Sequence, residues 1–488
     1  MALDHDLLSI QEARDLADSA YQAQLIWKHA TQEEVDRVCT AMADAVYAAS
    51  AQLGQMAHDE TGFGIVAHKK LKNEFGSRVV WESIKDIKTV GIIHHDPQRR
   101  IYDIAWPVGV IAALIPSTNP TSTAMYKIII AVKARDAMVI APHPSAARCT
   151  YETTRIMQQA AEKAGAPPNL ITCMQHISLP GTQELLKHKF VRLILATGGS
   201  AMVKVAHSVG KPAYGVGPGN VPAYVDRSAD LEKAARYIVN SKAFDCSTIC
   251  ASEQSVIADQ PIADKLKQLM IAEGAYFASE EQTDRLRKLL FHPNGAINTA
   301  TVGKPAQTVA GMAGFSIPQS ARVIVTPLQI TGQDEPLSRE KLTTVLAWYE
   351  EDGWEAGCDR SIELIMFGGR GHTQVIHATD ENVIMAFGLE KPVFRILVNT
   401  MGTLGAVGLT TGLMPSMTLG SGGVGGSITG DNITVHHLYN IKRLAYETTP
   451  PPQAALRGPQ PASAAVSNTQ DIETLVQQVV QEIINQTK

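Results

Sequence analysis

The stretch VGVIAALIPSTNPTSTAMYKIIIAVKARDAMVIAP, residues 108–142, decides the fold. Its ends, VGVIAALIP at 108–116 and AMVIAP at 137–142, are continuous apolar runs of the kind found in strands buried on both faces of a sheet. Between them, STNPTST forms a polar loop and AMYKIIIAVKARD has the length and composition of a helix. A buried strand, a helix and another buried strand predict a βαβ unit with parallel strands.

The same alternation of strand and helix extends in both directions from this unit. Downstream come a helix at 146–164 and strands at 170–175 and 191–197, and the C-terminal half continues with RVIVTPL, TTVLAWYE, SIELIMF, TQVIHA and FRILVNT. Upstream, residues 8–60 are predicted to be helical, with a capping box at Thr31–Glu34. We therefore expect two α/β domains, each built on an open parallel sheet.

The composition excludes several classes of function. At 488 residues the chain is too long for one simple core, and its 45% hydrophobic and 19% charged residues are typical of a globular protein. A net charge of −5 provides no basic surface for nucleic acid. The six cysteines have no framework spacing, the first twenty residues lack signal-peptide features, and the apolar runs are too short to cross a membrane. We expect a cytoplasmic protein that binds neither nucleic acid nor membrane.

The C-terminal residues have a different pattern. TTPPPQAALRGPQPASAAVSN, at 448–468, is rich in Pro, Ala and Ser and predicts a flexible linker. The helical pattern at 469–488 has an apolar stripe at i, i+3, i+4 and i+7, formed by Ile472, Leu475, Val476, Val479, Val480, Ile483 and Ile484. Its polar face carries Gln, Glu and Asn instead of Lys and Arg, which favours docking in a protein groove over binding to a membrane surface.

Two candidate nucleophiles, Cys246 and Cys250, lie in FDCSTICASEQS, residues 244–255. A nucleophilic cysteine needs thiolate character and hydrogen-bond donors for the oxyanion that it generates. The main-chain N–H of the nucleophile and a side-chain amide such as that of Asn119 would supply these donors. Either cysteine could instead be a small buried hydrophobic residue, and their spacing does not distinguish between the two.

Glycine-rich turns are candidates for phosphate binding. Gly198, Gly199 and Ser200 follow a buried strand and open a helix, which is the context of a dinucleotide pyrophosphate site, although a plain tight turn fits equally well. Gly215–Gly219 is a second candidate, and no metal-binding motif occurs in the sequence. Three histidines are candidate bases or, alternatively, surface or satisfied core residues: His207, His372 and His377.

Several stretches, in the same order, resemble the CoA-acylating aldehyde dehydrogenases. FDCSTICASEQSVI is similar to their active-site segment, which is close to F-D-x-x-x-I-C-A-S-E-Q-S, and the other stretches are IPSTNPTST, LILATGGSAMVKVA, KPAYGVGPGNVP, EKLTTVLAWY, GRGHT, LGSGGVGG and DNITVHHLYNIK. The resemblance runs from near residue 10 to residue 447. Within this family, the chain resembles the aldehyde dehydrogenase half of bifunctional aldehyde–alcohol dehydrogenases, without the iron-dependent alcohol dehydrogenase half. It also resembles standalone enzymes of bacterial microcompartments.

The resemblance implies an aldehyde dehydrogenase-like α/β fold, in which a Rossmann-type NAD-binding domain is joined to an α/β catalytic domain. We accordingly divide the chain into N-terminal helices with the NAD-binding domain (1–240), the catalytic domain (241–430), a return segment (431–447), the linker (448–468) and the flexible C-terminal amphipathic helix (469–488). The return segment is expected to pack with the first domain or in an oligomer interface.

The resemblance also assigns roles to particular residues. Cys250 occupies the position of the family nucleophile and Cys246 a variable position, while Asn119 matches the side-chain amide of the oxyanion hole. Glu340 aligns with a carboxylate that bonds the nicotinamide ribose, and Pro142-His143 stands where hydrolytic relatives have a ribose-binding lysine. The positions implied for NAD are Pro142, His143, Thr197, Gly198, Gly199, Ser200, Gly217 and Glu340.

One departure from the hydrolytic members of the superfamily points to the reaction. Those enzymes carry a Glu general base in an E-L-G-G-K segment, whereas the corresponding Tyr214–Asn220 has no carboxylate. Without that base, water should attack the acyl-enzyme slowly, which leaves the thioester for another thiol. We therefore expect NAD-dependent oxidation of a short-chain aldehyde with coenzyme A as the acyl acceptor. The alternatives are a non-acylating enzyme that releases a free acid and a non-catalytic scaffold.

The resemblance to microcompartment enzymes extends to the C-terminus and to assembly. Such enzymes often carry a short amphipathic helix on a linker that targets them to the shell. Residues 469–488 are therefore expected to bind shell proteins or co-encapsulated enzymes, with the enzyme in the lumen of the compartment. A helix for self-association is the alternative. We also expect a homo-oligomer, either a dimer or a tetramer.

Overall fold

The computed structural model describes residues 4–451 and 469–486. Most of the predicted linker, 452–468, lies outside the described residues. The chain divides into two compact units, of which the first comprises Met1–Ile93 with Ala105–Lys442 and the second His94–Ile104 with Arg443–Lys488. All of the candidate active-site residues belong to the first unit.

The N-terminal region is helical, as predicted. Its elements are α1 (His5–Trp27), α2 (Gln32–Ala48), α3 (Ser50–Thr61), α4 (Val66–Glu74), the π-helical turn η1 (Phe75–Val79) and α5 (Val80–Ile84). The predicted capping box is present at the start of α2, where the side chain of Thr31 accepts from the Glu34 N–H and the Glu34 carboxylate accepts from the Thr31 N–H. Two of the main-chain donors that a helix start leaves unpaired are thereby satisfied.

A five-stranded parallel sheet follows, in the order β5-β4-β3-β6-β7. Its strands are β3 (Val110–Ile115), β4 (Ala137–Pro142), β5 (Ile171–Cys173), β6 (Val191–Thr197) and β7 (Ala213–Val216). The connecting helices are α6 (Pro120–Lys133), α7 (Ala147–Lys163), α8 (Leu179–Lys187) and α9 (Ser200–Ser208). The predicted βαβ unit is confirmed as β3-α6-β4, and the strand order reverses between β3 and β6, as in a doubly wound Rossmann-type sheet.

A second parallel sheet has seven strands, in the order β10-β11-β12-β9-β8-β13-β14. They are β8 (Val221–Val225), β9 (Glu253–Asp259), β10 (Ala275–Phe277), β11 (Val323–Pro327), β12 (Val345–Glu351), β13 (Gln374–His377) and β14 (Ile396–Val398). The helices are α10 (Leu231–Ala243), α11 (Ala263–Ala272), α12 (Glu280–Leu290), α13 (Ala306–Met312), α14 (Trp354–Gly368), α15 (Glu381–Glu390) and α16 (Gly402–Ala406).

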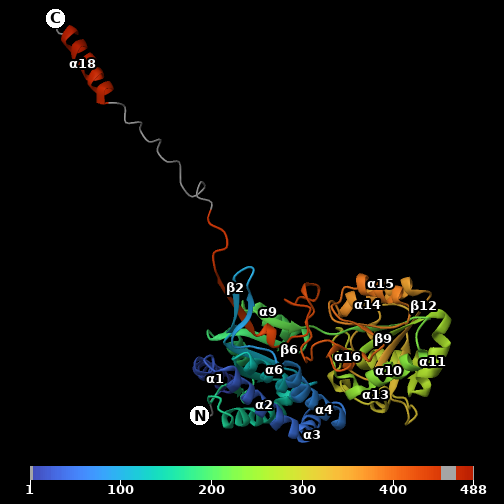
Figure 1. Ribbon diagram of the computed structural model, residues 1–488. Helices are drawn as coiled ribbons and strands as arrows, with labels where there is room; N and C mark the ends of the chain where they lie inside the picture. The colour runs from blue at the N-terminus through green and yellow to red at the C-terminus, as the bar shows by residue number, and fades with distance from the viewer. Residues whose placement is uncertain (1–3, 452–468, 487–488) are drawn as a thin grey trace. The chain divides into compact units, whose positions relative to one another are not determined.

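Each strand of the second sheet serves two cores, because alternate side chains of a strand point to opposite faces. Val323 and Val325 of β11 belong to the core that contains residues of α10 and α11. Ile324, between them, belongs to the core that contains residues of α12, α14 and α15. The sheet is thus covered by helices on both faces, with α10 and α11 on one and α14 and α15 on the other (Figure 1).

The sheets correct the predicted boundary at residue 240. Strand β8 pairs with β9, so residues 221–240 belong to the second sheet and its helices, and the change of sheet falls between Val216 and Val221. In the return segment, Ile433, Val435 and Leu438 are fully buried and belong to the same core as the strands of the first sheet. The physical reason for the error in the boundary is that a strand belongs to the sheet of the strands it pairs with, and the sequence of the strand itself does not indicate which strands those are.

The second unit contains parts of a three-stranded sheet and the C-terminal helix. The sheet has the order β1-β2-β15, with β1 (Gly91–Asp96), β2 (Ile101–Pro107) and β15 (Tyr439–Ala445). Helix α18 spans Thr469–Gln486. Large apolar side chains on it are exposed to solvent, namely Leu475, Val476, Val479, Val480 and Ile483. Among the described residues, no helix is long and apolar enough to cross a membrane.

Candidate active site

The carboxyl edge of the five-stranded sheet gathers several of the predicted site residues. Asn119 follows β3 and is the residue before α6, His143 directly follows β4, and Thr197 ends β6. Since parallel strands end at the same edge, the reversal of strand order between β3 and β6 opens a crevice there, where ligands bind in doubly wound folds. The sequence had indicated these residues separately, and the topology places them on one edge.

The glycine turn after β6 has the geometry expected of an anion site. Gly199 directly precedes α9, and no side chain caps the start of this helix. A Cβ atom added at Gly199 or Gly217 would meet no other atom within 4 Å, which leaves open space for a pyrophosphate. The hydroxyl of Thr197 bonds that of Thr418 at 3.0 Å. The side chain of Ser200 lies outside the described part.

His143 is exposed and faces its own turn. Its Nδ1 accepts from the Ser145 N–H at 3.2 Å and lies 2.8 Å from the Ser145 hydroxyl. Partial burial of the ring lowers the pKa of His143, which keeps the imidazole neutral at physiological pH. The preceding residue, Pro142, is buried at the end of β4.

Gly219 brings three of the candidate groups together. Its N–H donates to Oε1 of Glu340 at 2.9 Å. A Cβ atom at this position would lie 1.9 Å from the carbonyl oxygen of Cys250 and 3.1 Å from Cε1 of His372, so only glycine permits the approach. Gly219 is therefore the residue of this segment that contacts the Cys250 peptide.

Exposure separates the two cysteines that the sequence could not distinguish. All six cysteines lie among the described residues, and Cys250 is the one that is not buried. Cys246 is 2% exposed. Burial raises the pKa of the Cys250 thiol to about 12, with a further contribution from the Glu340 carboxylate and opposition from the Arg395 guanidinium. The thiol is therefore protonated at neutral pH and requires a base before it can act as a nucleophile.

Two titratable groups near Cys250 are candidates for that base. Burial raises the pKa of Glu340 to about 7. Burial, with a smaller effect of Arg395, lowers the pKa of His372 to about 3, and its Nε2 has no hydrogen-bond partner among the described residues. Of the other two histidines, His207 lies on α9 against Gly215 and His377 ends β13.

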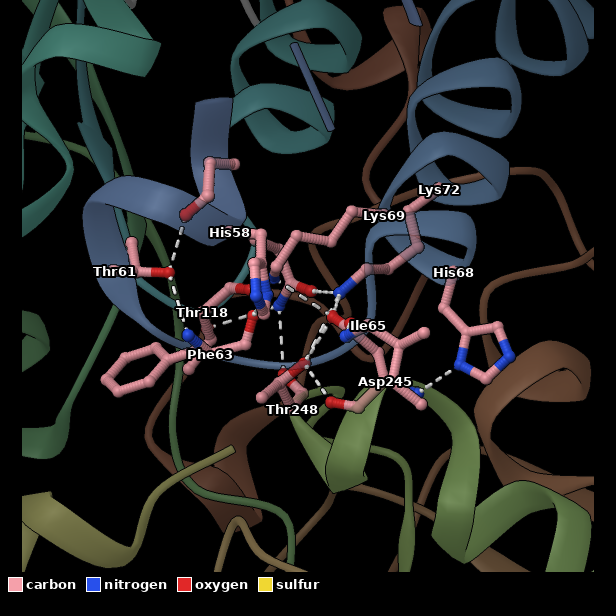
Figure 2. A network of polar contacts seen from close by, with 12 residues as sticks. His58, Thr61, Phe63, Ile65, His68, Lys69, Lys72, Thr118, Asp245 and Thr248 are labelled. Atoms are coloured by element: carbon pink, nitrogen blue, oxygen red, sulfur yellow. Dashed lines mark hydrogen bonds and ion pairs between the residues drawn. The ribbon is translucent and has the colours of Figure 1, made fainter. Parts of the chain in front are cut away.

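A buried ionic cluster, missed by sequence reasoning, anchors the cysteine segment. The carboxylate of Asp245 is fully buried, and its Oδ2 accepts from the ammonium groups of Lys69 and Lys72 and from the hydroxyl of Thr248. Its Oδ1 accepts from the Ile65 N–H at 2.7 Å. Figure 2 shows Lys69 and Lys72 reaching from the helix toward Asp245, beside Thr248. We call Asp245, Lys69 and Lys72 the aspartate cluster.

The aspartate cluster continues to the candidate oxyanion donor. The ammonium of Lys72 donates to Oδ1 of Asn119 at 2.5 Å and to the Thr248 hydroxyl at 3.3 Å. The amide nitrogen of Asn119 donates to the carbonyl oxygen of Thr248 at 3.0 Å and to the hydroxyl of Thr118 at 3.2 Å. Asn119 is thereby tied on one side to α4 and on the other to the loop that carries Cys250.

Burial and ion pairing both shift the pKa values of Lys72 and Asp245 in the aspartate cluster. Burial lowers the pKa of Lys72 to about 8, although the Asp245 carboxylate opposes the change. Burial alone would raise the pKa of Asp245, but Lys72 and Lys69 outweigh it and the pKa is lowered. Among the described residues, no group of three or more His, Cys, Asp or Glu side chains could hold a metal ion.

The backbone of the cysteine segment is unusual. Asp245, Cys246 and Ser247 have φ values of 48°, 52° and 65°, in the left-handed region that non-glycine residues rarely adopt. The turn before α4 makes room for Asp245, because a Cβ atom at Gly64 would lie 1.9 Å from Asp245 Oδ1. The hydrogen bonds to the Asp245 carboxylate hold this strained backbone in place.

The fold and the site define the class of protein. The aldehyde dehydrogenase family matches residues 6–285, and the chain belongs to this family. It is 37% identical over 442 residues to the bifunctional aldehyde-alcohol dehydrogenase of Escherichia coli strain K12, which covers 90% of this chain and 50% of that protein. The chain thus spans about half the length of the curated relatives of this kind that it matches.

Relatives of similar length have related descriptions. The acetylating succinate-semialdehyde dehydrogenase of Clostridium kluyveri is 36% identical over 434 residues, covering 89% of this chain and 95% of that protein. The crystal structure of an acetylating aldehyde dehydrogenase from Geobacillus thermoglucosidasius matches with a TM-score of 0.91 and 48% identity, covering 92% of this chain and 99% of that one.

Two more distant structures have informative ligands or origins. A propionaldehyde dehydrogenase of Rhodopseudomonas palustris with bound CoA and an acylated cysteine has a TM-score of 0.80 at 26% identity, covering 89% of this chain and 97% of that one. A propionaldehyde dehydrogenase from a fucose utilisation microcompartment of Clostridium phytofermentans has a TM-score of 0.79 at 27% identity, covering 88% and 96%.

Proposed function

We propose that this protein oxidises a short-chain aldehyde with NAD and transfers the acyl group to coenzyme A through a thioester on Cys250. One observation carries the proposal. Gly219, from the segment in which hydrolytic members of the superfamily have their glutamate base, lies against the Cys250 peptide, and the segment Tyr214–Asn220 brings no carboxylate there. Water near the thioester therefore lacks the glutamate base that hydrolytic relatives bring from this segment.

The first step requires a thiolate and a stabilised oxyanion. The Cys250 thiol gives its proton to Glu340, whose pKa of about 7 makes it a far stronger base than His372 at about 3, and the thiolate attacks the aldehyde carbonyl. The Asn119 amide N–H and the Cys250 main-chain N–H then donate to the oxyanion. The partly exposed position of Cys250 supports this assignment over the buried Cys246.

The residues at the carboxyl edge of the first sheet fit NAD. Gly198, Gly199 and the N-terminal amides of α9 would hold the pyrophosphate in the open space beside the turn, with Thr197, Ser200, Gly217, Pro142 and His143 around it and Glu340 at the nicotinamide ribose. NAD, when bound, accepts the hydride from the carbon attached to Cys250. The thioester that remains is then open to the thiol of coenzyme A. The acylated cysteine and bound CoA of the Rhodopseudomonas palustris relative support this order.

The test of this proposal is NADH formation from short-chain aldehydes with and without CoA, with the products identified by mass spectrometry. We expect acyl-CoA and strong dependence on CoA. Cys250→Ala should abolish the activity, while Cys246→Ala, a matched control four residues away, should keep much of it. Equal NADH rates without CoA, with free acid as the product, would instead establish a non-acylating enzyme.

We also propose that α18 targets the enzyme to a bacterial microcompartment, and that the enzyme works there as a homo-oligomer. The exposed Leu475, Val476 and Val479 on α18 and the relative from a microcompartment support targeting. Truncation after residue 450 should leave the specific activity intact and abolish co-assembly with shell proteins. Loss of the oligomeric state on truncation, with co-assembly unaffected, would show that the helix serves self-association instead.

A further inference from the structure

Lys72 stands between the buried aspartate and the candidate oxyanion donor. It projects from α4, it is 4% exposed, and its ammonium bonds Asp245, Asn119 and Thr248. No step of the proposed reaction uses it. A buried lysine costs free energy unless its charge is paired and hydrogen-bonded. Here the partners of the ammonium are the candidate oxyanion donor and two residues of the segment that carries Cys250.

The ammonium determines which way the Asn119 amide faces. A primary amide can rotate by half a turn and exchange its oxygen and nitrogen, and both orientations are similar in shape. A lysine ammonium has donors only, so the amide oxygen must face Lys72. The amide nitrogen then faces the other way, where it donates to the Thr248 carbonyl, two residues before Cys250, and to the Thr118 hydroxyl. One of these two bonds has to give way when the N–H donates to an oxyanion.

The opposite orientation would be harmful in the proposed reaction. It would place the amide oxygen, an acceptor with a partial negative charge, on the side where the oxyanion develops. Donors that are oriented before the reaction stabilise the transition state because no reorganisation is needed when charge appears. An amide free to rotate loses part of this advantage, even though the residue itself is unchanged.

Asp245 keeps Lys72 in place and charged. Its carboxylate pairs with Lys72 and Lys69 in the interior, and the same oxygen accepts from the Thr248 hydroxyl. The ion pair between Asp245 and Lys72 therefore connects α4, Asn119 and the loop that carries Cys250. Lys69 differs from Lys72 in one respect that matters, because its second contact is the Thr118 carbonyl and not the Asn119 side chain.

We propose that Lys72, held by Asp245, is a positioning residue that fixes the Asn119 amide with its N–H toward the oxyanion formed at Cys250. The proposal rests on the proposed function, since it requires that Asn119 stabilise an oxyanion. It also gives the pair of lysines on α4 separate roles, with Lys72 acting through Asn119 and Lys69 balancing the charge of Asp245.

A double-mutant cycle on the full chain tests this inference. Lys72→Met should lower kcat for CoA-dependent aldehyde oxidation by about 10- to 100-fold, a part of the loss seen when an oxyanion donor is removed, with a much smaller change in the KM for aldehyde. In an Asn119→Ala background, Lys72→Met should cost almost nothing more, because the amide that it orients is gone. Lys69→Met is the matched control, and its effect should multiply with that of Asn119→Ala.

A second measurement separates positioning from a general loss of structure. Alkylation of Cys250 by iodoacetamide involves no oxyanion, so its rate in Lys72→Met should stay within about twofold of the wild-type rate. A loss of alkylation in parallel with kcat would show that Lys72 merely holds the cysteine loop, and would overturn the inference. Effects of Lys72→Met and Asn119→Ala that multiply would overturn it as well.

If Lys72→Met does not fold, Lys72→Gln makes the same test. The glutamine amide can donate to Asp245 but can also accept, so it no longer forces one orientation on Asn119. Its loss of kcat should again disappear in the Asn119→Ala background. Failure of the proposed function has a different signature, because the wild-type protein would then form no acyl-CoA or Asn119→Ala would keep the wild-type rate.

Discussion

Two buried polar clusters flank the segment that carries Cys250, and they handle charge in opposite ways. On the N-terminal side, the aspartate cluster joins one carboxylate to two lysines by direct ion pairs. On the other side, the ammonium groups of Lys242 and Lys341 hydrogen-bond to neutral acceptors among the described residues. We call this second group, centred on Gln254, the glutamine cluster.

The contacts of the glutamine cluster are amide and carbonyl oxygens. The Lys242 ammonium donates to Oε1 of Gln254 at 3.0 Å, and that of Lys341 donates to the main-chain carbonyl of the same residue at 3.1 Å. Burial places the pKa of Lys242 well below its usual value and lowers that of Lys341 to about 7. The neighbouring Glu253 is bonded to the Gly402 N–H, its Oε2 has no partner among the described residues, and burial raises its pKa to about 7.

The difference shows what decides whether a buried group keeps its charge. Where a counter-ion lies at hydrogen-bond distance, as at Asp245, the carboxylate stays ionised, and its pKa falls despite complete burial. Where the hydrogen-bond partners are neutral, burial outweighs the neighbouring charges and the groups move toward their neutral forms. The cysteine loop is thus held by charge on one side and by largely neutral hydrogen bonds on the other.

The largest effect is expected from Asp245→Asn, which removes one charge and keeps the shape. Two buried ammonium groups would lose their counter-ion, so the free energy of unfolding should fall by about 3–5 kcal/mol. Urea denaturation at neutral pH measures the change. A loss below about 1 kcal/mol would mean that the ion pairs contribute little and would remove the distinction between the clusters.

A smaller, pH-dependent effect is expected from Glu253→Gln. The folded-state pKa of Glu253, about 7, lies above its unfolded value, so its contribution to stability is complete below about pH 4.3 and is lost as the pH rises through 7. Glutamine mimics the neutral acid and does not titrate. Relative to wild type, the variant should therefore gain on the order of 2 kcal/mol between pH 5 and pH 8.

The measurement is the unfolding free energy of both proteins at the two pH values. Glu340 titrates in the same range but is present in both, so it cancels in the difference. A difference between variant and wild type that does not change with pH would show that Glu253 is ionised in the folded protein at both values, like Asp245.

The smallest effect is expected from Lys242→Met. Burial shifts the pKa of Lys242 so that the side chain moves toward its neutral form, and it hydrogen-bonds to Oε1 of Gln254. Without the lysine, that oxygen still accepts from the Lys341 main-chain N–H at 3.1 Å. Methionine fills a similar volume, so the loss in unfolding free energy should be about 1 kcal/mol or less. A loss as large as that of Asp245→Asn would show that Lys242 is charged and essential to the cluster.

The fold could be predicted from sequence where local pattern determines structure. The apolar runs at 108–116 and 137–142 gave the first βαβ unit, and Thr31–Glu34 marked the start of α2. The domain boundary at 240 was wrong because Val221–Val225 has the same buried-strand pattern as the strands of either sheet. Its hydrogen bonds to β9 depend on the whole topology.

The site was predictable in a similar measure. The turn after β6 followed from strand–turn–helix context and Asn119 from the family resemblance, but the contact between Gly219 and the Cys250 peptide depends on a close approach that no spacing indicates. Asp245, Lys69 and Lys72 were missed because partners 173 residues or more apart leave no local trace. The available signal was two lysines three positions apart on one helix face, beside buried Asn73.

The left-handed backbone at Asp245, Cys246 and Ser247 restricts which substitutions the chain can accept. A left-handed conformation costs about 1–2 kcal/mol per residue for most amino acids, a smaller amount for asparagine and almost nothing for glycine. The thiol of Cys246 has no proposed role. In a library of all substitutions at this position, tolerance of the left-handed backbone should therefore decide which residues allow folding, more than similarity to cysteine. Glycine should be enriched, and valine and isoleucine should be depleted, although they are close to cysteine in hydrophobic character.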